Sequence, residues 1–283
     1  MTKRAPIRTR SWLFTPATHP ERFAKASQSG ADVAILDLED AVAPGDKVRA
    51  RNTALDYLAG NPSDGTLHAL RINGLDTRTG ISDLDALLGS KAAPDFLVLP
   101  KTETVGHLEI LDRLLTAAGK ATRLIGLIES ARGLAAVEAI ATATPRLVGL
   151  MLGAADMAAD LGAAIAWDPL AFARGRLIAA CALAGVTPID APFFDTRDEV
   201  GLKKEVAAAV ALGFAAKAAI HPAQIGAINA ALAPTAEAVE KARAIIRENS
   251  KGVGMIDGQM IDEAIARKAR RILAAAGFDV WTR

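Results

Sequence analysis

Three acidic residues end an apolar run near the start of the chain, where a buried strand is expected. The run "VAILDLEDAV" contains Asp37, Glu39 and Asp40. A carboxylate is costly to bury, so each of these groups needs a hydrogen bond, a cation or a metal ion as its partner. Glu129 ends a second apolar run, "RLIGLIES", and Asp156 follows a third, "RLVGLMLGAAD". Acids that collect at the ends of strands suit a site for a divalent cation.

Basic and amide side chains end two further apolar runs. Arg71 and Asn73 end "LHALRIN", and Lys101 follows "FLVLP". An acid cluster that faces one arginine and one lysine suits a divalent cation together with an anionic substrate. The scattered histidines and the single cysteine show no zinc-ligand spacing. We therefore expect Mg²⁺, which commonly takes one or two carboxylates and leaves its other positions to water and substrate oxygens.

Eight short apolar runs predict the strands that position these side chains. Near-continuous apolar runs are typical of strands buried on both faces. The run centres lie 23 to 40 residues apart, as strand–helix units require. Between them, 103–119 and 199–213 have an amphipathic helical pattern that ends at a glycine. The expected strands are 11–17, 33–39, 67–73, 96–102, 123–130, 146–152, 187–194 and 215–221.

This alternation predicts a (β/α)₈ TIM barrel in residues 1–234, followed by a helical extension in 235–283. The competing fold is a doubly wound open sheet, which would need a glycine-rich turn after the first strand. The turn "TPATHPERF" has no such glycines, and "GVGMIDG" follows a helical pattern, so the barrel is favoured. Active sites of this barrel gather at the carboxyl ends of its strands, so the acids are expected to converge there.

Composition and charge exclude several classes of function. The 283 residues carry a formal net charge of +1 with both signs interspersed, which gives no general attraction to nucleic acid or membrane. No apolar stretch is long enough to span a bilayer, and the basic first residues lack the apolar core of a secretory signal. The single cysteine excludes an internal disulfide and fits a reducing compartment. We therefore expect a cytoplasmic protein.

Each acid also has a purely structural explanation. The acids Asp37, Glu39 and Asp40 could pair with Arg71 or cap the following helix, and for them a structural role and a functional role are equally favoured. Glu129 could interact with a helix N-terminus, and Asp156 could cap a turn. When Glu129 and Asp156 are considered one at a time, the structural explanation is preferred. When they are considered together, at the ends of adjacent strands, a metal site is preferred.

The motifs resemble those of a known family. In chain order they are "RSWLFTPATHPERFAKA", "ILDLEDAV", "LRINGLDT", "FLVLPKTE", "IGLIESARGL", "LGAADMAADLG", "AAIHPAQI" and "GQMIDEAIARKARRIL". They cover almost the whole chain and resemble the β subunit of citrate lyase and the CitE-like acyl-CoA lyases, within the HpcH/HpaI aldolase superfamily. The match is specific for the family and says little about the substrate.

The resemblance implies a Mg²⁺-dependent oxo-acid lyase. Glu129 and Asp156 match the metal ligands, and Ala155 lies beside them in the substrate site. Arg71 matches the arginine that binds the carboxylate of a 2-oxo acid in a bidentate fork, and Asp37 is grouped with it as catalytic. Such enzymes cleave a CoA thioester that carries a hydroxyl and a carboxylate on its third carbon. The products are a 2-oxo acid and an acetyl-type thioester.

The resemblance also implies an oligomer. Asp262 of "GQMID" matches an aspartate that related lyases supply from a neighbouring subunit as the proton donor. We therefore expect 235–283 to pack on or swap with a neighbouring subunit of a homo-oligomer, either a trimer or a hexamer. From the residues alone, Asp262 is a helix N-cap, because an amphipathic stretch follows it.

Basic residues after the first two expected strands are candidates for binding the coenzyme A phosphates. The family resemblance points to Arg22, Lys25, Lys47 and Arg51, although ordinary solvated helix charges explain them equally well. His221 is interpreted as a structural loop residue and not as the general base.

Three other functions stay open. The chain could act on citryl-acyl carrier protein within a citrate lyase complex, or on free aldehydes as a pyruvate-dependent aldolase, or bind CoA thioesters without turnover. The motif "GQMID" counts against the free aldolase. The joint presence of Arg71, Glu129, Asp156 and Asp262 counts against a non-catalytic protein. The sequence does not choose between malyl, methylmalyl, citramalyl and citryl substrates.

Overall fold

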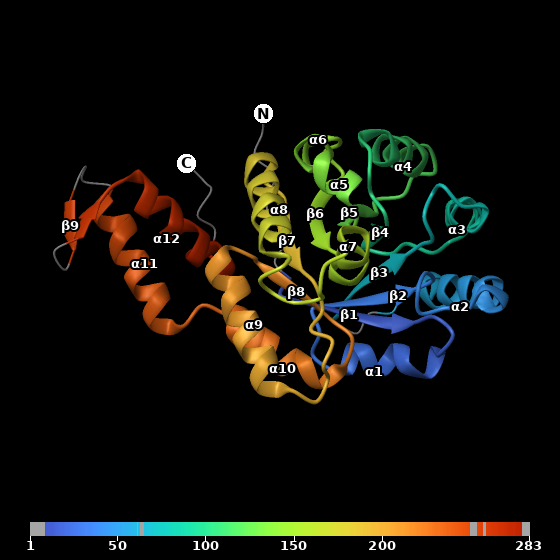
Figure 1. Cartoon of the computed structure of the whole chain (residues 1–283), viewed down its shortest axis with the longest axis horizontal. Helices are drawn as coiled ribbons and strands as arrows, with labels where there is room; N and C mark the ends of the chain where they lie inside the picture. Colours follow the sequence, from blue (N-terminus) through green and yellow to red (C-terminus); the bar gives the residue numbers. More distant parts are fainter. Residues whose placement is uncertain (1–8, 61, 63–64, 250–253, 257–258, 279–283) are drawn as a thin grey trace. The chain divides into compact units, whose positions relative to one another are not determined.

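The computed structural model describes residues 9–60, 62, 65–249, 254–256 and 259–278 (Figure 1). Contacts along the chain divide it into two compact units, Met1–Asn229 and Ala230–Arg283, which are described separately below.

The first unit is a closed barrel of eight parallel strands. Each strand pairs with the next one along the chain, and β8 pairs back with β1. The predicted TIM barrel is therefore confirmed. The strands are β1 (Ser11–Pro16), β2 (Val33–Asp37), β3 (Leu67–Arg71), β4 (Phe96–Leu99), β5 (Arg123–Ile128), β6 (Leu147–Leu152), β7 (Thr187–Asp190) and β8 (Ala216–Ala219).

Helices connect the strands and lie outside them in Figure 1. Several begin at a side chain that accepts a hydrogen bond from the first turn, which fixes the start of the helix. The helices are α1 (Phe23–Gln28), α2 (Lys47–Ala59), α3 (Arg78–Gly89), α4 (Val105–Ala117), α5 (Ala131–Ala135), α6 (Val137–Thr142), α7 (Ala154–Leu161), α8 (Ala171–Ala184), α9 (Glu199–Leu212) and α10 (Ile225–Leu232), with short 3-10 turns η1 (Pro20–Arg22), η2 (Pro44–Asp46) and η3 (Pro222–Gln224). The capping residues include Thr77, Thr104, Ser130 and Asp198.

Residue alternation along the strands determines what faces the barrel interior. The inner core contains Trp12 and Phe96, whose ring centroids are 4.9 Å apart, together with aliphatic side chains from the other strands. Because side chains alternate between the two faces of a strand, Asp37 shares the inner face with Ile35 of the same strand. Asp37 also pairs in register with Arg71 on β3. Asp37 and Arg71 thus lie on the inner faces of their strands, at the carboxyl-terminal mouth of the barrel.

The observed strands end earlier than the apolar runs suggested. β2 ends at Asp37, β4 at Leu99 and β5 at Ile128. Glu39, Lys101 and Glu129 therefore lie in the loops that follow the strands, where the backbone can turn and aim each side chain at its neighbours.

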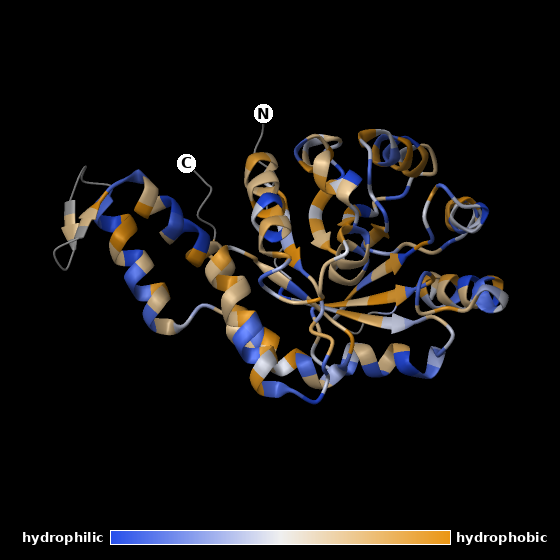
Figure 2. Ribbon diagram, in the orientation of Figure 1, coloured by the Kyte–Doolittle hydropathy of each residue, from blue (hydrophilic) through white to orange (hydrophobic). Residues whose placement is uncertain are grey.

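A second, larger core fills the space between the barrel and its helices. It consists mainly of leucine, isoleucine and alanine from the outward faces of the strands and from α2 to α8. Figure 2 shows the consequence, since the strands are mostly hydrophobic in colour while the helices carry both kinds of residue. No helix in the described part of the chain is long and apolar enough to cross a bilayer.

The second unit contains two helices and a two-stranded ribbon. Its elements are α11 (Ala236–Asn249), β9 (Gly254–Ile256), β10 (Gln259–Ile261) and α12 (Glu263–Ala275), and the two strands pair antiparallel. Ala242, Ala269 and Leu273 form its small core. Asp262 is the N-cap of α12, and its Oδ1 accepts a hydrogen bond of 2.9 Å from the N–H of Ile265.

Candidate active site

Arg71 is the centre of an ion-pair cluster at the carboxyl end of the barrel. Its Nε and Nη2 each donate a hydrogen bond of 2.6 Å to Asp37, one to each carboxylate oxygen. Its Nη1 lies 2.8 Å from Glu39 Oε2 and 3.7 Å from Asp40 Oδ2. Burial acts to lower the pKa of Arg71, but the three carboxylates outweigh it and hold the pKa above its ordinary value. The bidentate partner of Arg71 in the structure is therefore Asp37.

Lys101 links the cluster around Arg71 to Glu129, which follows β5. Its φ of 47° is in the left-handed region, which costs a residue other than glycine on the order of 1–3 kcal/mol. In this conformation its backbone N–H donates to Glu129 Oε1 at 2.7 Å, and its Nζ donates to Glu39 Oε1 at 2.9 Å. Burial acts to lower the pKa of Lys101, but the hydrogen bond and charge of Glu39 raise it. One strained residue thus contacts two carboxylates.

Glu129 is almost fully buried, with 2 % of its surface exposed. Burial is the main cause that raises its pKa to about 8, and the charges of Glu39 and then Asp156 raise it further. The hydrogen bond from the Lys101 N–H acts in the opposite direction, with an effect between those of Glu39 and Asp156. A side-chain carbon at position 153 would lie 2.5 Å from Glu129 Cβ and from Oε2, so glycine is required there. The loop is therefore built around this carboxylate, whose pKa stays raised although the charge of Arg71 acts to lower it.

Asp156 lies in the first turn of α7, directly after Ala155, and is partly exposed. The N-cap of α7 is Gly153, so Asp156 does not cap the helix. The proximity of its charge to Glu129 shows in the raised pKa of Glu129. Within the described residues, no three His, Cys, Asp or Glu side chains form a metal-binding group. Glu129 and Asp156 would offer a pair of carboxylates, a donor set that fits Mg²⁺ with water and substrate oxygens as its other ligands.

Several residues expected at or near the site donate hydrogen bonds within the protein. The Nζ of Lys47 donates to the carbonyls of Leu38 at 2.8 Å and Glu39 at 2.6 Å. Asn73 donates to Asp83 at 2.6 Å, and Arg51 donates to the same carboxylate at 2.6 Å. Lys47 and Arg51 are therefore engaged within the protein, and Lys47 sets the position of Glu39.

Arg22 and Lys25 are exposed and lie directly after β1, in η1 and α1. The Nε of Arg22 lies 3.8 Å from Glu21 Oε1, which is a loose surface pair. His221 is a loop residue, and its Nδ1 accepts a hydrogen bond of 3.2 Å from the N–H of Ala223. Asp262 caps α12 in the second unit and is exposed.

A second buried ion cluster escaped prediction. Asp190, at the end of β7, accepts hydrogen bonds from Arg174 Nε at 2.9 Å and from Lys217 Nζ at 2.6 Å. Lys217 is 1 % exposed and also donates to Glu205 at 2.8 Å. These residues join β7 and β8 to α8 and α9 on the outside of the barrel. The signal was present in "TPIDAP" and "AAKAAIH", where a charge interrupts an apolar run as Asp37 does.

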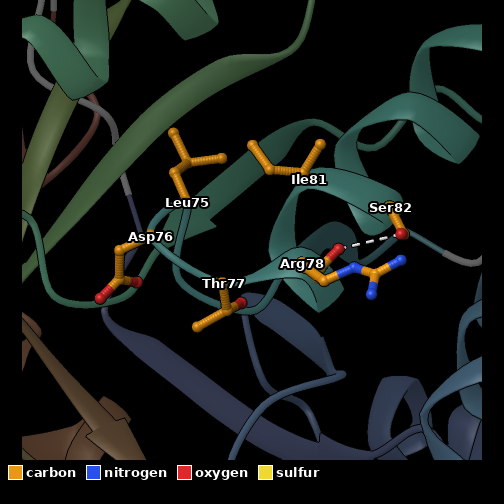
Figure 3. Close-up of a pocket in the computed structure, with 6 residues that line it drawn as sticks. All are labelled: Leu75, Asp76, Thr77, Arg78, Ile81 and Ser82. Atoms are coloured by element: carbon orange, nitrogen blue, oxygen red, sulfur yellow. Dashed lines mark hydrogen bonds between the residues drawn. The ribbon is translucent and has the colours of Figure 1, made fainter.

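Two surface hollows flank the first unit's loops. One, of about 350 Å³, is lined by the start of α3 and holds none of the expected site residues (Figure 3). The hydroxyl of Thr77 in its wall is used to cap α3, accepting from Gly80 N at 3.0 Å. The other, of about 250 Å³, includes Ala154, which lies two residues before Asp156, and the buried Arg174. The second hollow adjoins α7, the helix that carries Asp156.

A closed parallel barrel with paired carboxylates and a buried arginine at its strand ends defines a TIM-barrel enzyme class. The family model described as C-C bond lyase of the TIM-barrel fold matches residues 172–278. The HpcH/HpaI aldolase/citrate lyase model matches residues 10–222. The chain belongs to the HpcH/HpaI aldolase/citrate lyase family, as its motifs indicated.

Named relatives cover almost the full length of the chain. It is 36 % identical over 306 residues to the L-malyl-CoA/beta-methylmalyl-CoA lyase of Rhodobacter capsulatus, covering 96 % of each chain.

Two solved structures are also similar. RipC from Yersinia pestis is 58 % identical with a TM-score of 0.73, covering 81 % of this chain and 97 % of that one. CitE from Mycobacterium tuberculosis, in complex with magnesium, acetoacetate and coenzyme A, is 35 % identical with a TM-score of 0.79, covering 96 % of this chain and 100 % of that one.

Proposed function

We propose that this protein is a Mg²⁺-dependent carbon–carbon lyase for a 3-hydroxy-3-carboxyacyl-CoA thioester of the malyl, citramalyl or citryl type. It cleaves this substrate to a 2-oxo acid and an acetyl-type CoA, or catalyses the reverse condensation. The observation that carries the proposal is the pair Glu129 and Asp156 at adjacent strand ends, within electrostatic reach of Arg71.

The relatives support the substrate class. The Rhodobacter relative is named for malyl-CoA and beta-methylmalyl-CoA. Mycobacterium tuberculosis structures contain magnesium with acetoacetate and coenzyme A, or with the 2-oxo acid oxaloacetate. An oxo acid and a CoA thioester are the two halves that the proposed reaction joins or separates.

Glu129 and Asp156 would hold the metal ion, with the backbone at Ala155 beside the oxo acid. When bound, Mg²⁺ supplies a Lewis acid that polarises the carbonyl oxygen of the oxo acid. A bound cation would offset the burial and the charges of Glu39 and Asp156 that raise the pKa of Glu129, and would add to the weaker opposing effect of Arg71. The site is thus arranged for a cation.

Arg71 binds the carboxylate of the oxo acid, and Asp37 acts through Arg71. The two short hydrogen bonds that Arg71 donates to Asp37 fix the guanidinium plane and hold its Nη1–Nη2 edge in one orientation. A fixed fork selects a planar carboxylate and orients the bond that breaks.

Asp262 supplies the proton that the enolate of the departing thioester takes up at its terminal carbon. We place it in the active site of a neighbouring subunit, so the enzyme is a homo-oligomer, either a trimer or a hexamer. The exposed Arg22 and Lys25, together with the remaining N–H of Lys47, bind the phosphates of coenzyme A.

A cleavage assay tests the proposal directly. Purified protein is incubated with malyl-, β-methylmalyl-, citramalyl- and citryl-CoA, with and without Mg²⁺, beside the variants Glu129→Ala and Asp262→Ala. We expect cleavage of at least one thioester, loss in Glu129→Ala and a large reduction in Asp262→Ala. If no CoA thioester is cleaved but citryl-acyl carrier protein is, the chain is instead a citrate lyase subunit.

A further inference from the structure

Arg71 has little capacity left for a substrate. Asp37 occupies the edge of the guanidinium formed by Nε and Nη2. The only other edge that can hold a carboxylate in two hydrogen bonds is the one shared by Nη1 and Nη2. Glu39 Oε2 already lies 2.8 Å from Nη1, one of the two nitrogens of that edge. A substrate carboxylate that pairs with this edge of Arg71 therefore competes with Glu39 for Nη1.

Glu39 is buried, so a displaced carboxylate would need another cation close by. Lys101 provides it, because its Nζ is already 2.9 Å from the second oxygen of Glu39. An ammonium has three N–H donors, and 46 % of the Lys101 side chain is exposed, so it can accommodate both oxygens of Glu39.

The backbone of Lys101 is arranged to keep the ammonium in this place. The next residue, Thr102, donates its N–H to Leu127 O at 3.1 Å and its hydroxyl to Leu99 O at 2.9 Å. These bonds fix the turn in which Lys101 takes its φ of 47°. The strain at Lys101 persists because the surrounding turn is held on both sides.

We propose that Lys101 is a positioning residue whose ammonium takes over Glu39 when the carboxylate of a 2-oxo acid pairs with Arg71. Glu39 thus exchanges between two cations: on Arg71 it excludes other anions, and on Lys101 it leaves the Nη1 edge open. The inference rests on the proposed function, since it takes an oxo acid as the ligand of Arg71.

Calorimetric binding of pyruvate, oxaloacetate and glyoxylate at saturating Mg²⁺ tests this exchange. Without the ammonium, Glu39 stays on Arg71 and competes with the ligand. We expect Lys101→Met to weaken oxo-acid binding about tenfold or more, the effect of one lost charge-assisted hydrogen bond. Lys101→Arg should retain most of the affinity. Lys101→Gly, which keeps the backbone conformation but not the ammonium, should behave like Lys101→Met.

The double variant Lys101→Met with Glu39→Gln separates this exchange from a general structural role. Removal of the competing charge should restore oxo-acid binding to within about threefold of the wild type. Binding of Mg²⁺ alone, titrated separately, should change by less than about threefold in Lys101→Met, because another side chain at position 101 keeps the N–H bond to Glu129. Lys91→Met, an exposed lysine before β4, is the matched control.

The inference is wrong if Lys101→Met binds the oxo acids as well as the wild type does. It is also wrong if Glu39→Gln does not relieve the defect, or if Mg²⁺ binding falls by as much as oxo-acid binding. A wild-type protein that binds none of the three oxo acids would instead overturn the proposed function. A structure of the complex should show Glu39 on Lys101 Nζ and the ligand on Arg71 Nη1.

Discussion

Asp37 and Arg71 are register partners on adjacent strands, and their side chains meet in two hydrogen bonds of 2.6 Å inside the barrel mouth. Removal of one partner of a buried pair leaves the other charge poorly compensated. We expect Asp37→Asn to lower the free energy of unfolding by about 3 kcal/mol and to raise KM for the thioester. Urea denaturation measures the first effect. Asp46→Asn, which breaks an exposed pair with Arg49, is the control and should cost less than about 0.5 kcal/mol.

Binding of Mg²⁺ should depend on pH through Glu129. Its pKa in the folded protein is about 8, above the ordinary value of 4.5, so at pH 7 the group holds a proton that a metal must displace. Affinity for Mg²⁺ should therefore rise with pH and level off above about 8, falling about tenfold for each pH unit below that value. Calorimetry in two buffers of different ionisation enthalpy should show about one proton released per ion at pH 7.

The same shift has a consequence for stability. Because the folded state holds the proton up to a higher pH than the unfolded state does, the metal-free protein should lose stability as pH rises from about 4.5 to about 8. Glu129→Gln removes the titrating group, so this part of the pH dependence should disappear in that variant. An unchanged pH profile in Glu129→Gln would show that another group is responsible.

Gly153 is expected to be intolerant of any side chain. A methyl group there would lie 2.5 Å from Glu129 Cβ and Oε2, so Gly153→Ala must displace the carboxylate or the loop. Such overpacking costs about 1–3 kcal/mol, and Mg²⁺ affinity should fall with it. Gly175→Ala in α8 is the matched control, since its Cβ meets nothing within 4 Å. That variant should bind Mg²⁺ normally and be as stable as the parent or more stable.

Lys217 should be needed for stability rather than for chemistry. Lys217→Met leaves Asp190 and Glu205 without its ammonium in a buried setting, at an expected cost of about 3–5 kcal/mol. Lys203→Met, which removes an exposed pair with Glu199, should cost less than about 0.5 kcal/mol. At a temperature where both variants are folded, kcat should match that of the wild type.

Subunit mixing tests the placement of Asp262. Glu129→Ala and Asp262→Ala should each be inactive or nearly so. If each site takes Glu129 from one subunit and Asp262 from its neighbour, a co-refolded equal mixture should regain about a quarter of the wild-type sites. If both residues act from the same chain, every site in the mixture lacks either Glu129 or Asp262. Activity then stays at the level of the separate variants.

The sequence was sufficient to predict the barrel because its strands are continuous apolar runs at regular spacing. It also located Asp37, Arg71, Glu129 and Asp156 at strand ends, because a charge that ends an apolar run is conspicuous. It could not give the pairing among them. Whether Arg71 meets Asp37 or a ligand depends on strand register and side-chain geometry, which one sequence does not contain.

Other features were beyond sequence reasoning for different reasons. The left-handed conformation of Lys101 has no sequence signal, because lysine is not a residue that favours it. The cluster around Asp190 combines residues from α8, α9, β7 and β8, so only the folded chain brings it together. Lys47 was expected to face coenzyme A, and its bonds to the backbone of Leu38 and Glu39 became visible only in three dimensions.

The closure of the barrel also bears on how the protein avoids aggregation. Every strand from β1 to β8 has two hydrogen-bonded neighbours, so the sheet presents no open edge on which another chain could add a strand. Among the described residues, the ribbon of β9 and β10 is the sheet that keeps two open edges. Backbone pairing between misfolded chains should therefore begin at this ribbon, and a proline placed on its outer edge should suppress it without disturbing the barrel.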